Sequence, residues 1–157
     1  MKGNAPKTRD YFAEMYVAGL FADHGWNVYF PRRDEGFDFI VTKKSASEAV
    51  IRPVQVKGLY PTDAKKSRLV FGYQGKLSQV HGEMVLAIVF FGRGAKEKAP
   101  AHVAFMPRSE IRERQRGGWR CVPAALTEDG PAPRREFQKF FDAAGLTRLE
   151  EQKPEKD

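Results

Sequence analysis

The sequence predicts an α/β fold in which a mixed central β-sheet is flanked by helices. The chain opens with a helical pattern, continues with three strand-like segments, and returns to strands and a last helix after an irregular stretch. One later strand, "EMVLAIVFF" from Glu83, is apolar at almost every position, which is typical of a central strand buried on both faces. A length of 157 residues with 41% hydrophobic content is enough for one domain with a substantial core.

The first element predicted is a helix over "RDYFAEMYVAGLFADHG", residues 9–25. Thr8 is a suitable N-cap, and Asp10 lies in the first turn, where the helix dipole favours an acid. Gly25 is a natural C-terminal stop. The segment is apolar nearly all round, so we expect the helix to be packed on more than one side.

Three strands are expected next, at residues 26–32, 37–43 and 49–57, because each combines apolar and β-branched residues between turn-like segments. The polar turn over residues 43–48 should bring the third strand back beside the second. Pro53 interrupts the third strand, because proline lacks an N–H donor and belongs at an edge or a bulge.

The second half of the chain is less regular. Residues 58–82 suggest only a short strand over 68–72 and a short helix around Leu77. Beyond the apolar strand, we expect a strand over 102–107, a helix over 109–115 capped by Ser109, a strand over 118–123 and a helix over 134–145. Residues 1–149 should form one domain, and the charged residues 150–157 a disordered tail.

The charge of the chain favours a polyanionic partner, with high solubility as the alternative. Lys and Arg number 27 against 20 Asp and Glu, which gives a net charge of +7. The basic residues are clustered, as in Lys65-Lys66-x-Arg68 and Arg112-x-Arg114-x-Arg116. The apolar runs are too short to cross a bilayer, and the single cysteine, Cys121, cannot form an internal disulfide. We therefore expect a cytoplasmic protein without a membrane segment.

Three polar side chains interrupt the best strand-forming segments. Because strand side chains alternate between faces, Gln55 and Lys57 point one way while Val54 and Val56 point the other. If the second and third strands pair through the 43–48 turn, Asp38 lies on the same face as Gln55 and Lys57. The alternatives are an Asp38 that pairs with a neighbouring arginine and a solvated hairpin face for the other two.

Glu14 on the first helix is a fourth candidate. It shares a stripe with Tyr11, Ala18 and Phe21, and it is the only charged residue on that stripe. A carboxylate on a packed face needs a compensating partner. Glu14 therefore reaches Lys57 or a metal, or else the helix is more exposed than expected; Asp34 and Glu35 are alternative acids.

The sequence combines an acid on the first helix, Asp38 in "GFD", and "QVK" after a short turn. This combination resembles the PD-(D/E)XK nuclease superfamily, especially its Holliday-junction-resolvase-like and transposon-endonuclease-like branches. The resemblance covers roughly residues 8–91 and implies a restriction-endonuclease-like core. It implies Glu14, Asp38, Gln55 and Lys57 as the catalytic set of a metal-dependent DNA endonuclease. Two features depart from the pattern: no proline precedes Asp38, and Gln55 stands where glutamate is usual. Some active members of the superfamily carry glutamine there.

A site of this composition suits Mg²⁺, with Mn²⁺ as an alternative, because hard cations take oxygen ligands and keep several waters. Asp38, the Gln55 side-chain oxygen and the Val56 carbonyl would be the ligands, and Lys57 would act at the scissile phosphate. The basic residues expected to contact nucleic acid are Arg32, Arg33, Lys65, Lys66, Arg68 and Lys76.

Two alternatives to a DNA endonuclease remain open at this stage. The chain could be a catalytically inactive module that keeps the fold and binds nucleic acid, with Gln55 as the sign of a decayed centre. RNA could replace DNA as the substrate, since no residue distinguishes the two. The resemblance also implies a homodimer, because resolvase-like members of the superfamily are often dimers.

Overall fold

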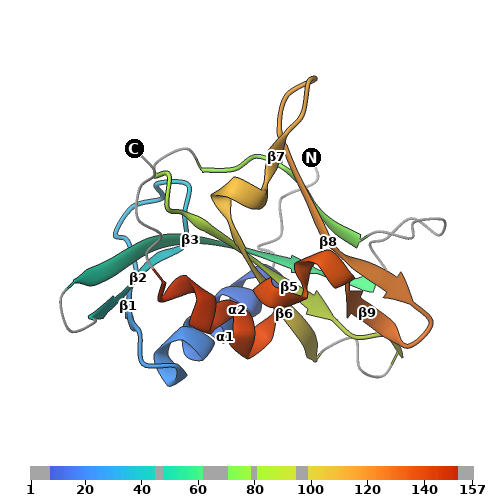
Figure 1. Ribbon diagram of the computed structural model, residues 1–157, viewed down its shortest axis with the longest axis horizontal. Coiled ribbons are helices and arrows are strands. Elements are labelled where there is room, and N and C mark those ends of the chain that lie inside the picture. The colour runs from blue at the N-terminus through green and yellow to red at the C-terminus, as the bar shows by residue number, and fades with distance from the viewer. Residues whose placement is uncertain (1–7, 45–47, 62–70, 79–80, 95–98, 152–157) are drawn as a thin grey trace.

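The central sheet of the protein has five strands in the order β1-β2-β3-β5-β6 (Figure 1). The computed structural model describes residues 8–44, 48–61, 71–78, 81–94 and 99–151. The elements are α1 (Thr8–Asp23), β1 (Asn27–Tyr29), β2 (Phe39–Lys44), β3 (Ala49–Leu59), β4 (Phe71–Gly75), β5 (Val85–Phe91), β6 (Pro100–Pro107), η3 (Arg108–Glu110), β7 (Arg112–Glu113), β8 (Trp119–Thr127), β9 (Gly130–Pro133), η4 (Arg135–Phe140) and α2 (Asp142–Leu149).

The strand directions make this a mixed sheet. β3 runs parallel to β5, whereas β1, β2 and β6 each pair antiparallel with their neighbours. The predicted α/β class with a mixed central sheet is confirmed. None of the described helices is both long and apolar enough to cross a membrane.

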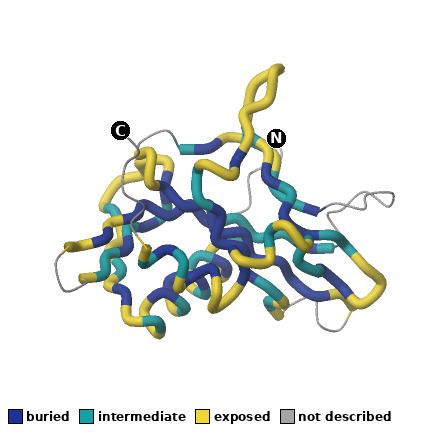
Figure 2. The backbone as a smooth tube through the Cα atoms, in the orientation of Figure 1, coloured by how far each residue is buried: buried dark blue, intermediate teal, exposed yellow. Residues whose placement is uncertain are grey.

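β5 is the centre of the molecule, as its apolar sequence predicts. All seven of its residues are buried, and they form part of the continuous buried run in Figure 2. Its odd-numbered residues belong to the core beneath α1 and α2, and its even-numbered residues belong to a second core on the opposite face. Strand alternation therefore makes β5 the wall between the two cores.

α1 covers one face of the sheet and ends where the sequence predicts. Gly25 has φ +89°, a left-handed conformation that glycine adopts without strain. The helix packs Ala13, Val17 and Phe21 into the core. The expected packing on more than one side is wrong, because Tyr11 and Phe12 are exposed by 66% and 47%.

The opposite face is covered by a second sheet, β4-β8-β7, with β9 paired to β8. The strand expected over 118–123 is thus the start of a longer β8. The helix expected over 109–115 is wrong: residues 108–110 form a single 3₁₀ turn and residues 112–113 form β7. Leu77 lies in an irregular segment and not in a helix, and residues 62–70, which include most of the strand expected over 68–72, lie outside the described residues.

The helix expected over 134–145 is divided into η4 and α2. Phe141 is extended and forms an isolated bridge with Ala104, and Asp142 follows with φ +54°. The Asp142 carboxylate accepts a hydrogen bond from the Val103 N–H at 2.9 Å. These contacts with β6 break the helix at a point that the local sequence does not mark.

Pro53 lies inside β3 without breaking the ladder. It is paired with Ile40 of β2, but the pairing of β3 with β5 begins only at Val54. Because Val54 presents its carbonyl to the β2 side, the ring nitrogen of Pro53 points to the other edge, where β5 has not yet begun. The missing donor therefore costs no hydrogen bond between strands.

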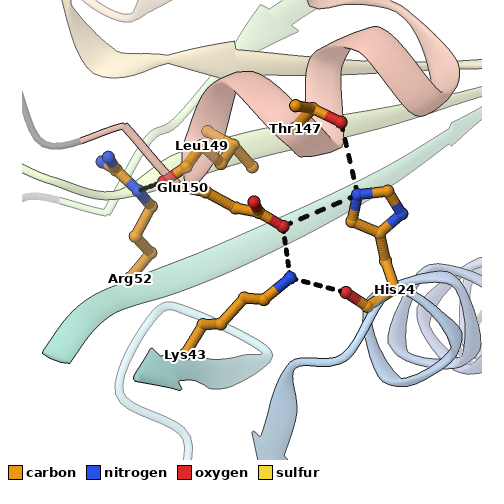
Figure 3. A network of polar contacts seen from close by, with 6 residues as sticks. All are labelled: His24, Lys43, Arg52, Thr147, Leu149 and Glu150. Atoms are coloured by element: carbon orange, nitrogen blue, oxygen red, sulfur yellow. Dashed lines mark hydrogen bonds and ion pairs between the residues drawn. The ribbon is translucent and has the colours of Figure 1, made fainter. Parts of the chain in front are cut away.

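A polar network ties the end of α2 to the rest of the domain (Figure 3). Lys43 donates to the backbone carbonyl of His24 at 2.9 Å and forms an ion pair with Glu150. Residues 150–157 were expected to form a tail, but Glu150 takes part in this network; residues 152–157 lie outside the described residues.

Arg52 closes the C-terminal end of α2. Its side chain is 9% exposed, and the guanidinium forms an ion pair with Glu83 at 2.8 Å. It also donates to the carbonyls of Leu149 at 2.9 Å and Glu151 at 3.3 Å. Both carbonyls lie at the end of the helix, where no further helical turn supplies donors.

We expect Arg52→Met to lower the free energy of unfolding by about 2–3 kcal/mol, because two carbonyls lose a charged donor. Urea denaturation followed by circular dichroism measures the change. Glu83→Gln is the matched control: Glu83 is 64% exposed, so losing the ion pair alone should cost less than about 1 kcal/mol. Equal stability of Arg52→Met and the wild type would contradict this role.

Candidate active site

The site begins where β2 stops pairing with β3. The β2–β3 register ends at Phe39 and Val54, but β3 continues to Leu59. Asp38 lies at this point, and its N–H donates to the Val54 carbonyl at 2.8 Å, one residue out of step with the Phe39–Val54 pair. Beyond Val54, the edge of β3 that faced β2 is therefore bordered by the Asp38 side chain.

The Asp38 carboxylate replaces a strand at this edge. Its Oδ2 accepts a hydrogen bond from the Val56 N–H at 2.6 Å. In an extended strand the N–H and C=O of one residue point to the same edge, so the Val56 carbonyl also faces the Asp38 side of β3. A carboxylate and a main-chain carbonyl thus lie along one short edge.

α1 adds Glu14 to this edge. Its carboxyl is hydrogen-bonded to that of Asp38, and its pKa is raised from 4.5 to about 7. Burial is the main cause, followed by the negative charge of Asp38, the hydrogen bond with Asp38 and the charge of Asp10. Two carboxyl groups this close favour one shared proton or one shared cation.

Lys57 lies on the other face of β3 and acts on Glu14 through its charge. Val54 and Val56 belong to the core beneath α1, so strand alternation turns Gln55 and Lys57 toward the second sheet. The Lys57 ammonium lies 5.7 Å from the centre of the Tyr73 ring on β4. Its positive charge lowers the pKa of Glu14, which opposes the stronger effects of burial and Asp38.

Gln55 is 8% exposed, and the structure gives its amide two main-chain partners. Its Oε1 accepts from the Ser78 N–H at 3.0 Å, and its Nε2 donates to the Lys76 carbonyl at 3.3 Å. This pattern needs an acceptor and a donor on one side chain, which an amide has and a carboxylate lacks. Gln55 therefore holds the segment between β4 and β5 against β3, and its role as a metal ligand stays a prediction.

The donor set fits a hard divalent cation. Glu14, Asp38 and the Val56 carbonyl offer oxygen atoms from three elements, which is the chemistry that Mg²⁺ prefers. The charge repulsion that raises the pKa of Glu14 is the kind that a bound cation removes. Within the described residues, no group of three or more His, Cys, Asp and Glu side chains forms a metal cluster. Any metal here would depend on backbone, water and substrate oxygens as well.

Of the two alternative acids, Glu35 is exposed and Asp34 has another partner. The Asp34 carboxylate accepts from the Gly36 N–H at 2.9 Å, which closes a local turn. His81 accepts from the Glu83 N–H at 3.0 Å in an exposed turn. Asp38 is joined to Val56 and Glu14, and not to Arg32 or Arg33, in the contacts that the structure gives.

The basic residues expected to contact nucleic acid are placed as follows. Arg32, Arg33 and Lys76 are exposed, and Lys76 directly follows β4. The Lys76 carbonyl accepts hydrogen bonds from Gln55 and from the Tyr73 hydroxyl, so this lysine is held at the border of the site. Lys65, Lys66 and Arg68 lie outside the described residues.

Asp10, predicted only as an acid in the first turn of the helix, also contributes to the electrostatics of the site. It lies four residues before Glu14 on α1, and its charge adds to the rise of the Glu14 pKa. The spacing of four residues between two acids was the available signal.

Comparison of the sequence with family models and with curated proteins gave no match.

The pKa of Glu14 makes stability depend on pH. Between 4.5 and about 7 the folded protein holds a proton on Glu14 that the unfolded chain releases, so stability falls as the pH rises through this window. Melting temperatures measured with EDTA from pH 4 to 8 should show this fall. Glu14→Gln should flatten it, whereas the exposed control Glu35→Gln should not. An unchanged slope in Glu14→Gln would contradict the assignment.

Replacing Gln55 by glutamate tests the amide's structural role. In Gln55→Glu a carboxylate oxygen would face the Lys76 carbonyl, so we expect a loss of about 1–2 kcal/mol in unfolding free energy. Gln74→Glu, the same change at an exposed position of β4, should alter stability by less than about 0.5 kcal/mol. Urea denaturation measures both variants. Equal losses of unfolding free energy in the two variants would show that the two hydrogen bonds of Gln55 contribute no more to stability than an exposed glutamine does.

Proposed function

We propose that this protein is a metal-dependent endonuclease of the PD-(D/E)XK type that hydrolyses DNA phosphodiester bonds. One observation carries the proposal: the carboxyl groups of Glu14 and Asp38, from a helix and from the start of a strand, meet at one open edge of β3, and the charge of Lys57 on β3 acts on Glu14. Two acids that share a proton beside an ammonium, next to a main-chain carbonyl, suit binding of a cation together with a phosphate.

Mg²⁺, or Mn²⁺ in its place, is the proposed cofactor. Glu14, Asp38 and the Val56 carbonyl would hold it. Gln55 would be a further ligand if the second lone pair of its Oε1, the one not used by the Ser78 N–H, points to the ion. When bound, such an ion neutralises charge on the scissile phosphate and lowers the pKa of a water. The hydrogen bond from the Val56 N–H fixes one Asp38 oxygen, which leaves the other oriented for a ligand.

Lys57 is the proposed phosphate-side residue. Its ammonium is half-buried beside the Tyr73 ring and within the electrostatic reach of Glu14. A compact positive charge held in this way stabilises the negative charge that develops on a phosphate oxygen during hydrolysis. Glu14, which is protonated below a pH of about 7 in the absence of a cation, would also be able to exchange a proton at the site.

The proposed substrate and compartment follow from charge and cysteine chemistry. A net charge of +7 and the exposed Arg32, Arg33 and Lys76 favour a nucleic acid, with DNA as the first choice and RNA as the comparison. Cys121 is buried, and burial with the nearby Glu110 charge raises its pKa to about 12. A thiol of this kind stays unreactive. The proposed cytoplasmic setting rests on the single cysteine, which cannot form an internal disulfide.

The second candidate is a catalytically inactive module that binds nucleic acid. The observation in its favour is Gln55, whose amide is neutral and already bonded to the Lys76 and Ser78 backbone. Such a module would bind DNA with a steep dependence on salt and with no need for a divalent cation.

The two candidates are separated by Mg²⁺- or Mn²⁺-dependent cleavage of duplex, branched and single-stranded DNA, with RNA of matched sequence alongside. We expect Asp38→Asn and Lys57→Met each to lower the cleavage rate by about 100-fold or more. Asn can still accept from the Val56 N–H, so the fold should survive. Mg²⁺ should also raise the melting temperature of the wild type but not of Asp38→Asn.

Asp34→Asn and Lys44→Met are the matched controls, because both residues are exposed and each repeats one of the substitutions. They should cleave like the wild type. Cleavage that persists in Asp38→Asn and Lys57→Met would sink the endonuclease assignment. Metal-independent DNA binding without cleavage by the wild type would support the inactive module.

A further inference from the structure

A basic β-hairpin formed by residues 112–120 projects from the body of the protein (Figure 1). It contains four arginines, Arg112, Arg114, Arg116 and Arg120, and one acid, Glu113. All of these residues are exposed, as is the tip of the hairpin in Figure 2. The hairpin therefore carries concentrated positive charge away from the core.

The backbone of the hairpin has a defined turn. The Arg114 N–H donates to the Gly118 carbonyl at 2.9 Å, and the Gly117 N–H donates to the Arg114 carbonyl at 3.0 Å. Gly117 and Gly118 have φ values of +90° and +78°, which only glycine adopts readily. The tip thus has a specified backbone, which sets the points from which the arginine side chains extend.

The register of the hairpin places like charges together. Arg112 of β7 is directly opposite Arg120 of β8. Like charges at facing positions of an antiparallel pair destabilise the sheet unless a counter-charge lies between them. On the other side of β8, the residue of β4 paired with Arg120 is the neutral Gln74. The strands of the sheet therefore place no acid directly beside Arg112 and Arg120.

The hairpin is joined to the candidate active site through β4. At its base Trp119 packs beneath the Arg108 guanidinium at 5.1 Å, which anchors β8. β8 pairs with β4, and the Gln74 side-chain oxygen is placed to accept from Arg114 Nη2 at 2.9 Å. Tyr73, the residue before Gln74, is the one beside Lys57. A ligand held by the hairpin would therefore be positioned relative to Lys57 by a single small sheet.

We propose that this hairpin is a duplex-binding arm that enters the major groove of DNA, with its arginines on the flanking phosphates. The identity of the partner rests on the proposed function, but the binding does not need the catalytic site to be active. A two-stranded ribbon fits the wide major groove of B-DNA, whereas the major groove of duplex RNA is too narrow for side chains to enter. The facing pair Arg112 and Arg120 suits the close spacing of phosphates along a strand.

The test measures DNA binding without cleavage. Fluorescence anisotropy with a short labelled DNA duplex, in EDTA and over a range of NaCl concentrations, compares the full-length chain with Arg112→Gln/Arg116→Gln/Arg120→Gln. We expect the triple variant to bind at least about 10-fold more weakly and the salt slope to fall by about 2–3, because each lost phosphate contact releases one counterion fewer.

The charge-matched control is Lys44→Gln/Arg135→Gln/Lys139→Gln, which removes three exposed positive charges from β2 and η4. It should change binding by less than about 3-fold. Glu113→Gln keeps every arginine and removes the acid of the hairpin, so it should bind more tightly than the wild type. The triple hairpin variant should melt no lower than the wild type, because it loses the repulsion between Arg112 and Arg120.

Equal weakening by the two triple variants would overturn the proposal, because it would show that the net charge alone matters. An equal loss of binding to duplex RNA and duplex DNA would overturn groove entry. The wild type and the hairpin variant are also tested for binding to polyglutamate. If the hairpin variant binds DNA like the wild type but loses binding to polyglutamate, the hairpin is assigned to an acidic protein partner instead. Failure of cleavage in the wild type leaves this binding test intact.

Discussion

The hydrogen bond from the Val56 N–H to the Asp38 carboxylate is the interaction on which the site depends. It takes the place of a main-chain pair, so β2 begins only at Phe39 while its partner β3 runs on past Val54 to Leu59. A full-length β2 would cover this edge of β3 and bury the Val56 carbonyl in a ladder. By ending the ladder with a side chain, the chain satisfies the buried donor and leaves a polar edge inside an otherwise apolar sheet.

Two layers meet at that edge. α1 brings Glu14 from one face and packs against β3, so that a Cβ added at Gly58 would lie in van der Waals contact with the Ala13 side chain at 3.4 Å. The second sheet brings Tyr73 to Lys57 from the other face and continues into the basic hairpin. β5 separates the two cores, and the site lies on its neighbour β3, which both layers can reach.

Gln55 connects the site to the segment between β4 and β5, and it explains why an amide can be favoured over a carboxylate there. The amide both accepts from Ser78 and donates to Lys76, 23 and 21 residues further along the chain. A carboxylate could bind a cation more strongly, but it could not make the second bond. The residue thus holds the exposed Lys76 at the border of the site, at the expense of one formal charge near the proposed cation position.

The sequence by itself determined α1, its stop at Gly25, the buried central strand and the faces of Gln55 and Lys57, because these follow from local periodicity and from glycine's freedom at positive φ. The tertiary structure decided what depends on partners distant in the chain. Contacts with β6 divide the C-terminal helix at Phe141 and Asp142, and the Val56 N–H holds Asp38 at the edge. The amide of Gln55 is engaged by backbone that no local pattern marks. Periodicity reports which way a side chain points, whereas its partner is set by the packing of segments that meet only in the folded protein.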